Sequence, residues 1–161
     1  MKDLQDDRNK IVEEYADLVW RIALSRTRRE EAAEEVVQEV FLDLFRKERQ
    51  FKDEEHRKAW LIRATMLGCK QYRAAAFRTA TVSLEELGDS IAAVQEQSTV
   101  YEALLRLPAK YRLPLQLYYI EEMDSDACAK ALGLRPVTFR VRLHRGRDLL
   151  KKELKGEGID V

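Results

Sequence analysis

The stretch DSDACAKALGLRPVTFRVRLHRGRDLL, residues 124–150, decides how the C-terminal part of this chain folds. Asp124 is a favoured N-cap residue, so a short helix is expected to follow it over about 125–132. Gly133 can take the left-handed conformation that ends a helix, and Pro136 suits the first turn of the next one. Helix, tight glycine turn and helix together predict a helix-turn-helix.

The second helix of this pair has two unlike faces. At 100° per residue, Phe139, Leu143, Gly146 and Leu150 form one apolar stripe, which we expect to be buried. The rest of the surface is cationic and fits the DNA major groove, where arginine bridges guanine acceptors and valine can touch a thymine methyl group. The residues predicted to contact DNA are Arg135, Thr138, Arg140, Val141, Arg142, His144, Arg145 and Arg147. An ordinary solvent face would interleave acids with bases, whereas residues 135–147 contain no acid.

Charge is segregated along the chain although its net charge is 0. Residues 30–45 hold six acids and no base, residues 56–84 hold six bases and no acid, and residues 130–155 hold nine bases against two acids. Such blocks indicate two basic surfaces for a polyanion and one acidic surface for a basic partner. Solvated helix faces that happen to cluster are the alternative interpretation.

Helical spacing of apolar residues continues through the rest of the sequence, and no alternating strand pattern occurs. The pattern fades over 80–98, which is polar and rich in small residues and is interpreted as a flexible linker. We therefore predict an all-α chain of two small helical domains. Residues 1–79 form a three- or four-helix domain, and residues 99–161 form a helical domain that contains the helix-turn-helix.

Several classes of protein are not indicated by this sequence. Neither a signal peptide nor an apolar run of roughly 18 residues is present, so the expected location is the cytoplasm, without membrane insertion. Cys69 and Cys128 lie far apart, without a CxxC motif, and predict neither a metal site nor a disulfide framework. No phosphate loop or nucleophile signature occurs, so we expect no enzyme activity, no catalytic residues and no cofactor.

Two segments then carry a family resemblance. The run LRLPAKYRLPLQLYYIEEMDSDACAKALGLRPVTFRVRLHRGRDLLKKEL resembles region 4 of the extracytoplasmic-function (ECF) sigma factors of bacterial RNA polymerase. EEAAEEVVQEVFLDLFRK followed by KAWLIRATMLGCKQYR is similar to their region 2. The resemblance covers about residues 8–155 and implies a sigma factor for promoter-specific initiation, of stress or envelope-response type. Region 2 would be 1–79, for polymerase docking and the downstream promoter element, and region 4 would be 99–161, for the upstream element.

The resemblance also implies partners and contact residues. The partners would be promoter DNA and core RNA polymerase, through its clamp helices and flap, and an anti-sigma factor is a further candidate. The helix expected within the acidic residues 30–45 would dock on the polymerase clamp through Glu35, Gln38 and Glu39. The downstream element and separated strand would be held by stacking and a cationic track formed by Lys70, Tyr72, Arg73, Phe77 and Arg78. Trp60 is expected to belong to the core rather than to act as a wedge in DNA.

The sequence departs from the family pattern at functionally placed positions. Leu67 and Gln71 stand where asparagine and aspartate are common, which puts strand opening or its base preference in question. Arg135 replaces the serine that often caps the recognition helix. Two alternative functions therefore stay open, a stand-alone helix-turn-helix regulator and a sigma-like interaction protein without promoter opening.

Overall fold

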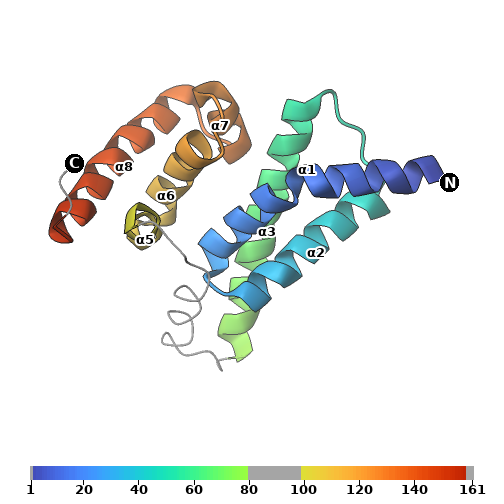
Figure 1. The fold of residues 1–161 in the computed structure, drawn as a ribbon, viewed down its shortest axis with the longest axis horizontal. Helices are drawn as coiled ribbons and strands as arrows, with labels where there is room; N and C mark the ends of the chain where they lie inside the picture. The colour runs from blue at the N-terminus through green and yellow to red at the C-terminus, as the bar shows by residue number, and fades with distance from the viewer. Residues whose placement is uncertain (1, 80–98, 159–161) are drawn as a thin grey trace. The chain divides into compact units, whose positions relative to one another are not determined.

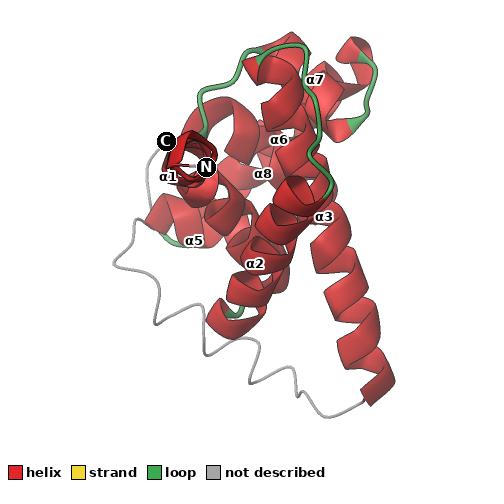
Figure 2. Cartoon of the chain, turned by 90° about the vertical axis from the view of Figure 1, so that its right-hand side faces the viewer, coloured by secondary structure: helices red, strands yellow, loops and turns green. Residues whose placement is uncertain are grey.

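The computed structural model describes residues 2–79 and 99–158. Every regular element in these residues is a helix and none is a strand, so the predicted all-α class is confirmed (Figure 2). The chain divides into two compact units, an N-terminal unit Met1–Ala93 and a C-terminal unit Val94–Val161. The predicted linker 80–98 lies outside the described residues.

The N-terminal unit contains three described helices, each in contact with the other two (Figure 1). These are α1 (Lys2–Thr27), α2 (Glu30–Arg46) and α3 (Glu54–Thr79). Their apolar stripes meet in a shared core that includes Val19, Ile22, Val36, Val40, Leu61 and Ile62. Asp53 caps α3, because its Oδ1 accepts a 2.8 Å hydrogen bond from the backbone N–H of His56.

In the C-terminal unit, the long helix α8 (Pro136–Gly156) contacts α5 (Thr99–Arg106), α6 (Ala109–Leu115) and α7 (Ser125–Leu132). The predicted apolar stripe of α8 supplies the centre of this core. Phe139 is fully buried, Leu143 and Gly146 are buried, and Leu150 is half-buried. The inward face of α8 therefore holds the unit together. The outward face of the helix is left available for contacts outside the chain.

The helix-turn-helix predicted from residues 124–150 is confirmed in its details. Asp124 Oδ1 accepts a 2.8 Å hydrogen bond from the backbone N–H of Ala127, as an N-cap should. Gly133 has φ 68°, and the N–H of Leu134 then donates to the carbonyl of Ala129 at 2.8 Å, which closes the end of α7. Pro136 begins α8, and the side chain of Arg135 makes no capping hydrogen bond.

A π-helical turn, η1 (Gln116–Ile120), follows α6 and was not expected from the sequence. Pro114 lies inside α6, where it has no N–H to donate to the preceding turn. The adjoining turn is fixed by Arg112, whose buried guanidinium donates to the carbonyls of Leu105 at 3.2 Å and Leu107 at 2.9 Å. Leu105 lies near the end of α5 and Leu107 directly after it, so one cation ties the end of α5 to α6.

Candidate DNA and polymerase interfaces

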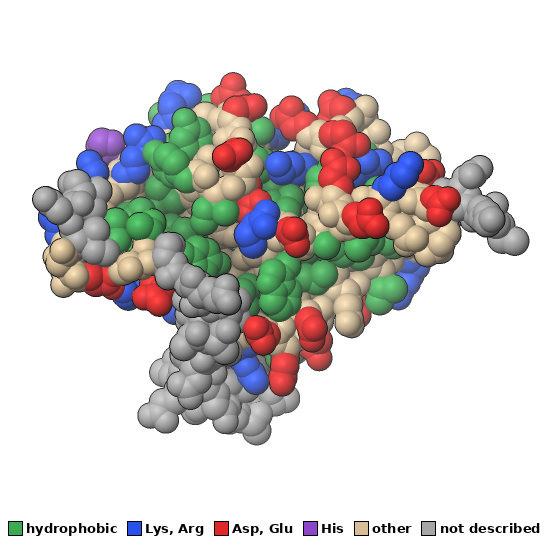
Figure 3. All heavy atoms as spheres, viewed as in Figure 1, with side chains coloured by type: hydrophobic (Ala, Val, Ile, Leu, Met, Phe, Trp, Pro, Cys, Tyr) green, Lys and Arg blue, Asp and Glu red, His purple; other side chains and the backbone are tan. Residues whose placement is uncertain are grey.

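The outward face of α8 carries most of the residues predicted to bind the upstream promoter element. Six of the eight are exposed, namely Arg135, Arg140, Val141, His144, Arg145 and Arg147, and the other two, Thr138 and Arg142, are half-buried. All eight lie on α8 or at its N-cap, so one rigid helix holds them in fixed register. Lys and Arg side chains gather over α8 in the space-filling view (Figure 3).

The cations on α8 differ in what surrounds them. His144 Nε2 lies 3.7 Å from Asp148 Oδ2, and the guanidinium of Arg147 lies 5.7 Å from the ring centroid of Tyr119. Within the described part of the chain, neither Arg140 nor Arg145 has an ion-pair partner. These two side chains are therefore available to a polyanion without the loss of an internal salt bridge.

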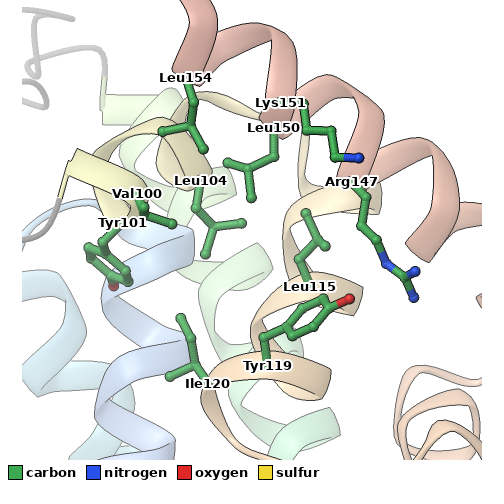
Figure 4. A pocket seen from close by; sticks show the side chains of 10 residues that line it. All are labelled: Val100, Tyr101, Leu104, Leu115, Tyr119, Ile120, Arg147, Leu150, Lys151 and Leu154. Atoms are coloured by element: carbon green, nitrogen blue, oxygen red, sulfur yellow. The ribbon is translucent and has the colours of Figure 1, made fainter. Parts of the chain in front are cut away.

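An apolar pocket opens beside the C-terminal half of α8 (Figure 4). Its volume is about 420 Å³, and its walls come from α5, α6, η1 and α8. The lining residues are Val100, Tyr101, Leu104, Leu115, Tyr119, Ile120, Arg147, Leu150, Lys151 and Leu154. Val100, Tyr119 and Ile120 are more than a third exposed, so the pocket can receive an apolar side chain of a partner without rearrangement of the core.

Sequence reasoning missed this pocket, although part of its signal is in the sequence. Val100 and Leu104 are four residues apart on α5, as are Leu150 and Leu154 on α8, so each pair faces one side of its helix. The opposite wall depends on the unexpected π-helical turn, which carries Tyr119 and Ile120. Helical periodicity alone could not place those two residues.

The outward face of α2 is acidic, as the sequence predicted. Glu35, Gln38 and Glu39, the residues predicted to bind polymerase, are all exposed. Acidic side chains gather over α2 in the space-filling view (Figure 3). Leu42 follows Gln38 by four residues and is 50% exposed, so the same face offers an apolar contact that sequence reasoning missed.

The basic part of α3 holds the residues predicted for the downstream element. Lys70 and Arg73 are exposed and Tyr72 is half-buried, whereas the side chains of Phe77 and Arg78 lie outside the described residues. Leu67 and Gln71, the two departures from the family pattern, are both exposed. Neither side chain therefore belongs to the buried core of the N-terminal unit.

Two further arginines, Arg26 and Arg28, lie close to Arg73 and were missed in the sequence. Burial lowers the pKa of both guanidinium groups, and the positive charge of Arg73 lowers it further. Three like charges brought together by the fold create a positive potential that an anion relieves. Arg73 lies more than 40 positions along the chain from the other two, which hid this cluster from sequence reasoning.

The N-terminal unit also has a pocket, of about 390 Å³, which is bordered by the loop between α2 and α3. Its lining includes three arginines, a glutamine and two phenylalanine rings: Arg8, Phe45, Arg49, Gln50, Phe51 and Arg57. Trp60 packs against this loop, since the Arg49 guanidinium lies 4.6 Å and the Phe51 ring centroid 6.0 Å from its ring centroid. Trp60 itself is half-buried, between the core role and the wedge role considered for it.

Metal and membrane chemistry find no support in the described residues. Cys69 and Cys128 are both buried and fall in different units. Across 2–79 and 99–158, no group of three acidic, histidine or cysteine side chains is placed to hold a metal ion. No helix there combines the length and the apolar character that a bilayer crossing requires.

Comparison with known proteins assigns both units. Residues 11–79 match the family model for sigma-70 region 2, and residues 97–150 match that for sigma-70 region 4. Similar proteins include the ECF RNA polymerase sigma factor SigW of Bacillus subtilis, 25% identical over 94% of this chain and 90% of its own length. The ECF sigma factor SigL of Mycobacterium tuberculosis is 28% identical over 92% of this chain and 89% of its own length.

Solved structures share the fold over nearly the whole chain. The sigma factor RpoE of Bartonella quintana, solved in complex with the anti-sigma factor NepR, superposes with a TM-score of 0.70 at 19% identity and covers 96% of this chain and 98% of its own. CnrH, solved with the cytosolic domain of CnrY, gives a TM-score of 0.66 at 22% identity, covering 94% and 90%. With regions 2 and 4 both present and in order, this chain belongs to the ECF sigma factors of bacterial RNA polymerase.

Proposed function

We propose that this sigma factor binds core RNA polymerase and selects promoters by placing α8 in the major groove of the upstream element. One observation carries the proposal. The helix that builds the core with Phe139 and Leu143 presents Arg140 and Arg145 outward, without an ion-pair partner among the described residues. A helix with such a division is rigid enough to give sequence register and cationic enough to hold phosphates.

Polymerase docking is proposed for two surfaces, one on each unit. On α2, Glu35, Gln38 and Glu39 would meet the clamp helices, with Leu42 as an apolar contact beside them. On the C-terminal unit, the apolar pocket walled by α5, η1 and α8 would receive an apolar side chain of the polymerase flap. Complementary charge guides the first contact, and burial of apolar surface stabilises the second.

Promoter opening is proposed for α3 and the loop before it. Lys70, Tyr72, Arg73, Phe77 and Arg78 would track the separated strand, which is held by stacking and by cations. A base removed from the duplex costs a few kcal/mol and needs a pocket that compensates for this cost. The cavity beside Arg49, Gln50 and Phe51 has the aromatic, amide and guanidinium groups that such a pocket requires.

In this function the polymerase performs the chemistry, and the sigma factor contributes specificity and strand separation through binding. Its proposed partners, promoter DNA and core polymerase, would be met in the cytoplasm, and a regulon of stress or envelope responses is proposed from the family resemblance. An anti-sigma factor is a candidate inhibitor, because one protein of similar fold was solved with the anti-sigma factor NepR. Another was solved with the cytosolic domain of CnrY. A partner helix seated in the apolar pocket would exclude the flap and so block holoenzyme assembly.

Reconstitution tests the proposal against its two alternatives. The full chain is mixed with bacterial core polymerase and a library of randomised promoter fragments, and the transcripts are sequenced. Initiation at a shared pair of sequence elements, dependent on the chain, supports the proposed function. Operator binding without polymerase would instead identify a stand-alone regulator. Polymerase binding without specific initiation would identify a sigma-like interaction protein.

A further inference from the structure

Two exposed valines run down the middle of the cationic face of α8. Val137 is 63% exposed and Val141 is 42% exposed. They are four residues apart on one helix, so their side chains lie on the same face, one turn from each other. At 100° per residue, Arg140 lies about 60° to one side of Val137 and Arg145 about 80° to the other. The valine pair is therefore flanked by a guanidinium group on each side.

Folding does not account for these two valines. The apolar side chains that α8 buries in its own unit include Phe139 and Leu143, which lie on the opposite face. Valine is also a poorer helix former than alanine, lysine or arginine, and exposing its side chain to water contributes nothing to stability. An apolar pair kept at the centre of a charged outward face indicates contact with a partner.

The flanking charges select the kind of partner. Arg140 and Arg145 lack an ion-pair partner in the described residues and favour a polyanion. In the major groove of DNA, the apolar group on the base edges is the 5-methyl group of thymine. A helix with apolar side chains between two cations therefore matches a groove with methyl groups between phosphates or guanine acceptors.

We propose that Val137 and Val141 read thymine methyl groups and that the upstream element carries thymine at two fixed positions. This inference rests on the proposed function of α8. Four residues of α-helix advance about 6 Å, and successive base pairs about 3.4 Å. The two thymines, on either strand, therefore lie about two base-pair steps apart where the helix axis follows the groove. Val137 was not among the residues that sequence reasoning assigned to DNA.

Replacing thymine by deoxyuridine tests the proposal, because it removes the methyl group and leaves base pairing intact. Holoenzyme first selects upstream elements from a random duplex library, and each selected thymine is then replaced singly by deoxyuridine. Affinity should fall about fourfold at each of two positions, the factor that corresponds to roughly 0.8 kcal/mol for one buried carbon. Val137→Ala should abolish the effect at one of these positions and Val141→Ala at the other.

Arg140→Ala is the matched control, since it should weaken binding while the sensitivity to deoxyuridine persists. Both valines are exposed, so their alanine variants should keep the helical signal and thermal unfolding of the parent protein. Suppose that DNA with thymine and DNA with deoxyuridine bind equally well at every position, while Arg140→Ala still binds promoter DNA more weakly. This result would overturn the proposed contacts of the valines with thymine methyl groups and would leave the proposed function in place. Wild-type affinity in Arg140→Ala and Arg145→Ala as well would remove the proposed role of α8 altogether.

Discussion

Gly146 of α8 lies so close to Leu115 of α6 that a Cβ atom at position 146 would stand 3.1 Å from Leu115 Cδ1. The same Cβ atom would stand 3.3 Å from the backbone carbonyl oxygen of Tyr111. The small residue expected in the apolar stripe is therefore the point where two helices of the C-terminal unit approach each other. This approach positions the recognition helix relative to α6, so it bears on DNA binding as well as on stability.

Enlarging this residue should destabilise the C-terminal unit. Gly146→Val places three carbons where one already crowds its neighbours, and overpacking of this kind costs about 1–3 kcal/mol. Urea unfolding followed by circular dichroism measures the loss. Gly156→Ala is the control, because a Cβ there would meet no described atom within 4 Å apart from its chain neighbours and the backbone of its own helix, and its stability should stay equal or rise. Equal stability of Gly146→Val and the parent would contradict the close approach.

The arginines of the outward face should carry promoter affinity. Arg140→Ala and Arg145→Ala should each weaken binding of the upstream element by roughly 1–3 kcal/mol if the contact is a bidentate one to a base. If the lost contact is to a phosphate, the line of log affinity against log salt should instead become less steep, by about one unit of slope. Titration of labelled promoter with holoenzyme at several salt concentrations separates the two cases. Lys110→Ala, which removes an exposed cation from α6, should leave both quantities unchanged.

Replacing Arg135 by serine should raise the stability of the protein and weaken its binding to DNA. It stands at the N-cap of α8 without a capping hydrogen bond, so Arg135→Ser should add a cap and raise stability by about 1 kcal/mol. The same change removes an exposed cation next to the recognition helix and should weaken promoter binding at low salt. Arg135→Ala lacks both groups and should lose affinity without the gain in stability. Thermal unfolding and promoter titration of the two variants check this reciprocity.

The acidic face of α2 should determine affinity for core polymerase. Gln38→Ala combined with Glu35→Lys reverses one exposed charge and removes an exposed amide, so the fold should be retained. We expect association with core polymerase to weaken at least tenfold, which is about 1.4 kcal/mol. Glu13→Lys, a charge reversal at an exposed position of α1, serves as the control. Unaltered affinity of the double variant in a fluorescence binding assay would exclude this docking surface.

Alkaline pH should destabilise the N-terminal unit through Cys69. Burial raises the pKa of its thiol to about 11 against the opposing charges of Arg26 and Arg73, whereas an unfolded chain has a cysteine pKa of about 8.5. The stabilisation is thus fully present below about pH 8.5 and is lost as the pH rises toward 11, by up to about 3 kcal/mol. The difference in unfolding free energy between the parent and Cys69→Ala, measured across this range, should narrow. A constant difference would show that the thiol does not ionise in this way.

The helix-turn-helix could be predicted closely because its signals are local. Asp124, Gly133 and Pro136 each act on the backbone within a few residues, and the structure places a cap, a left-handed turn and a helix start at those positions. The burial of Phe139 and Leu143 followed from helical periodicity in the same way. Local rules and a single periodicity were sufficient for the recognition helix.

The remaining features depend on contacts between distant residues, which periodicity cannot place. The cluster of Arg26 and Arg28 with Arg73 forms only when α1 and α3 pack together. The apolar pocket likewise needs the packing of α5 and α8 and a turn wider than an α-helix. Val137 was passed over because an apolar residue at a helix start carries no local signal of exposure. Sequence therefore indicated the faces of single helices, whereas the cavities required the assembled units.

The π-helical turn Gln116–Ile120 is the mark that a single inserted residue leaves in a helix. Deleting one residue there would restore α-helical winding and rotate Tyr119 and Ile120 by about 100° around the axis. The mouth of the pocket would lose one wall while the helix-turn-helix beyond it stayed intact. With the pocket as the proposed flap site, a one-codon deletion in this segment would therefore weaken docking of the C-terminal unit on the polymerase, while the acidic face of α2 and the outward face of α8 would keep their contacts.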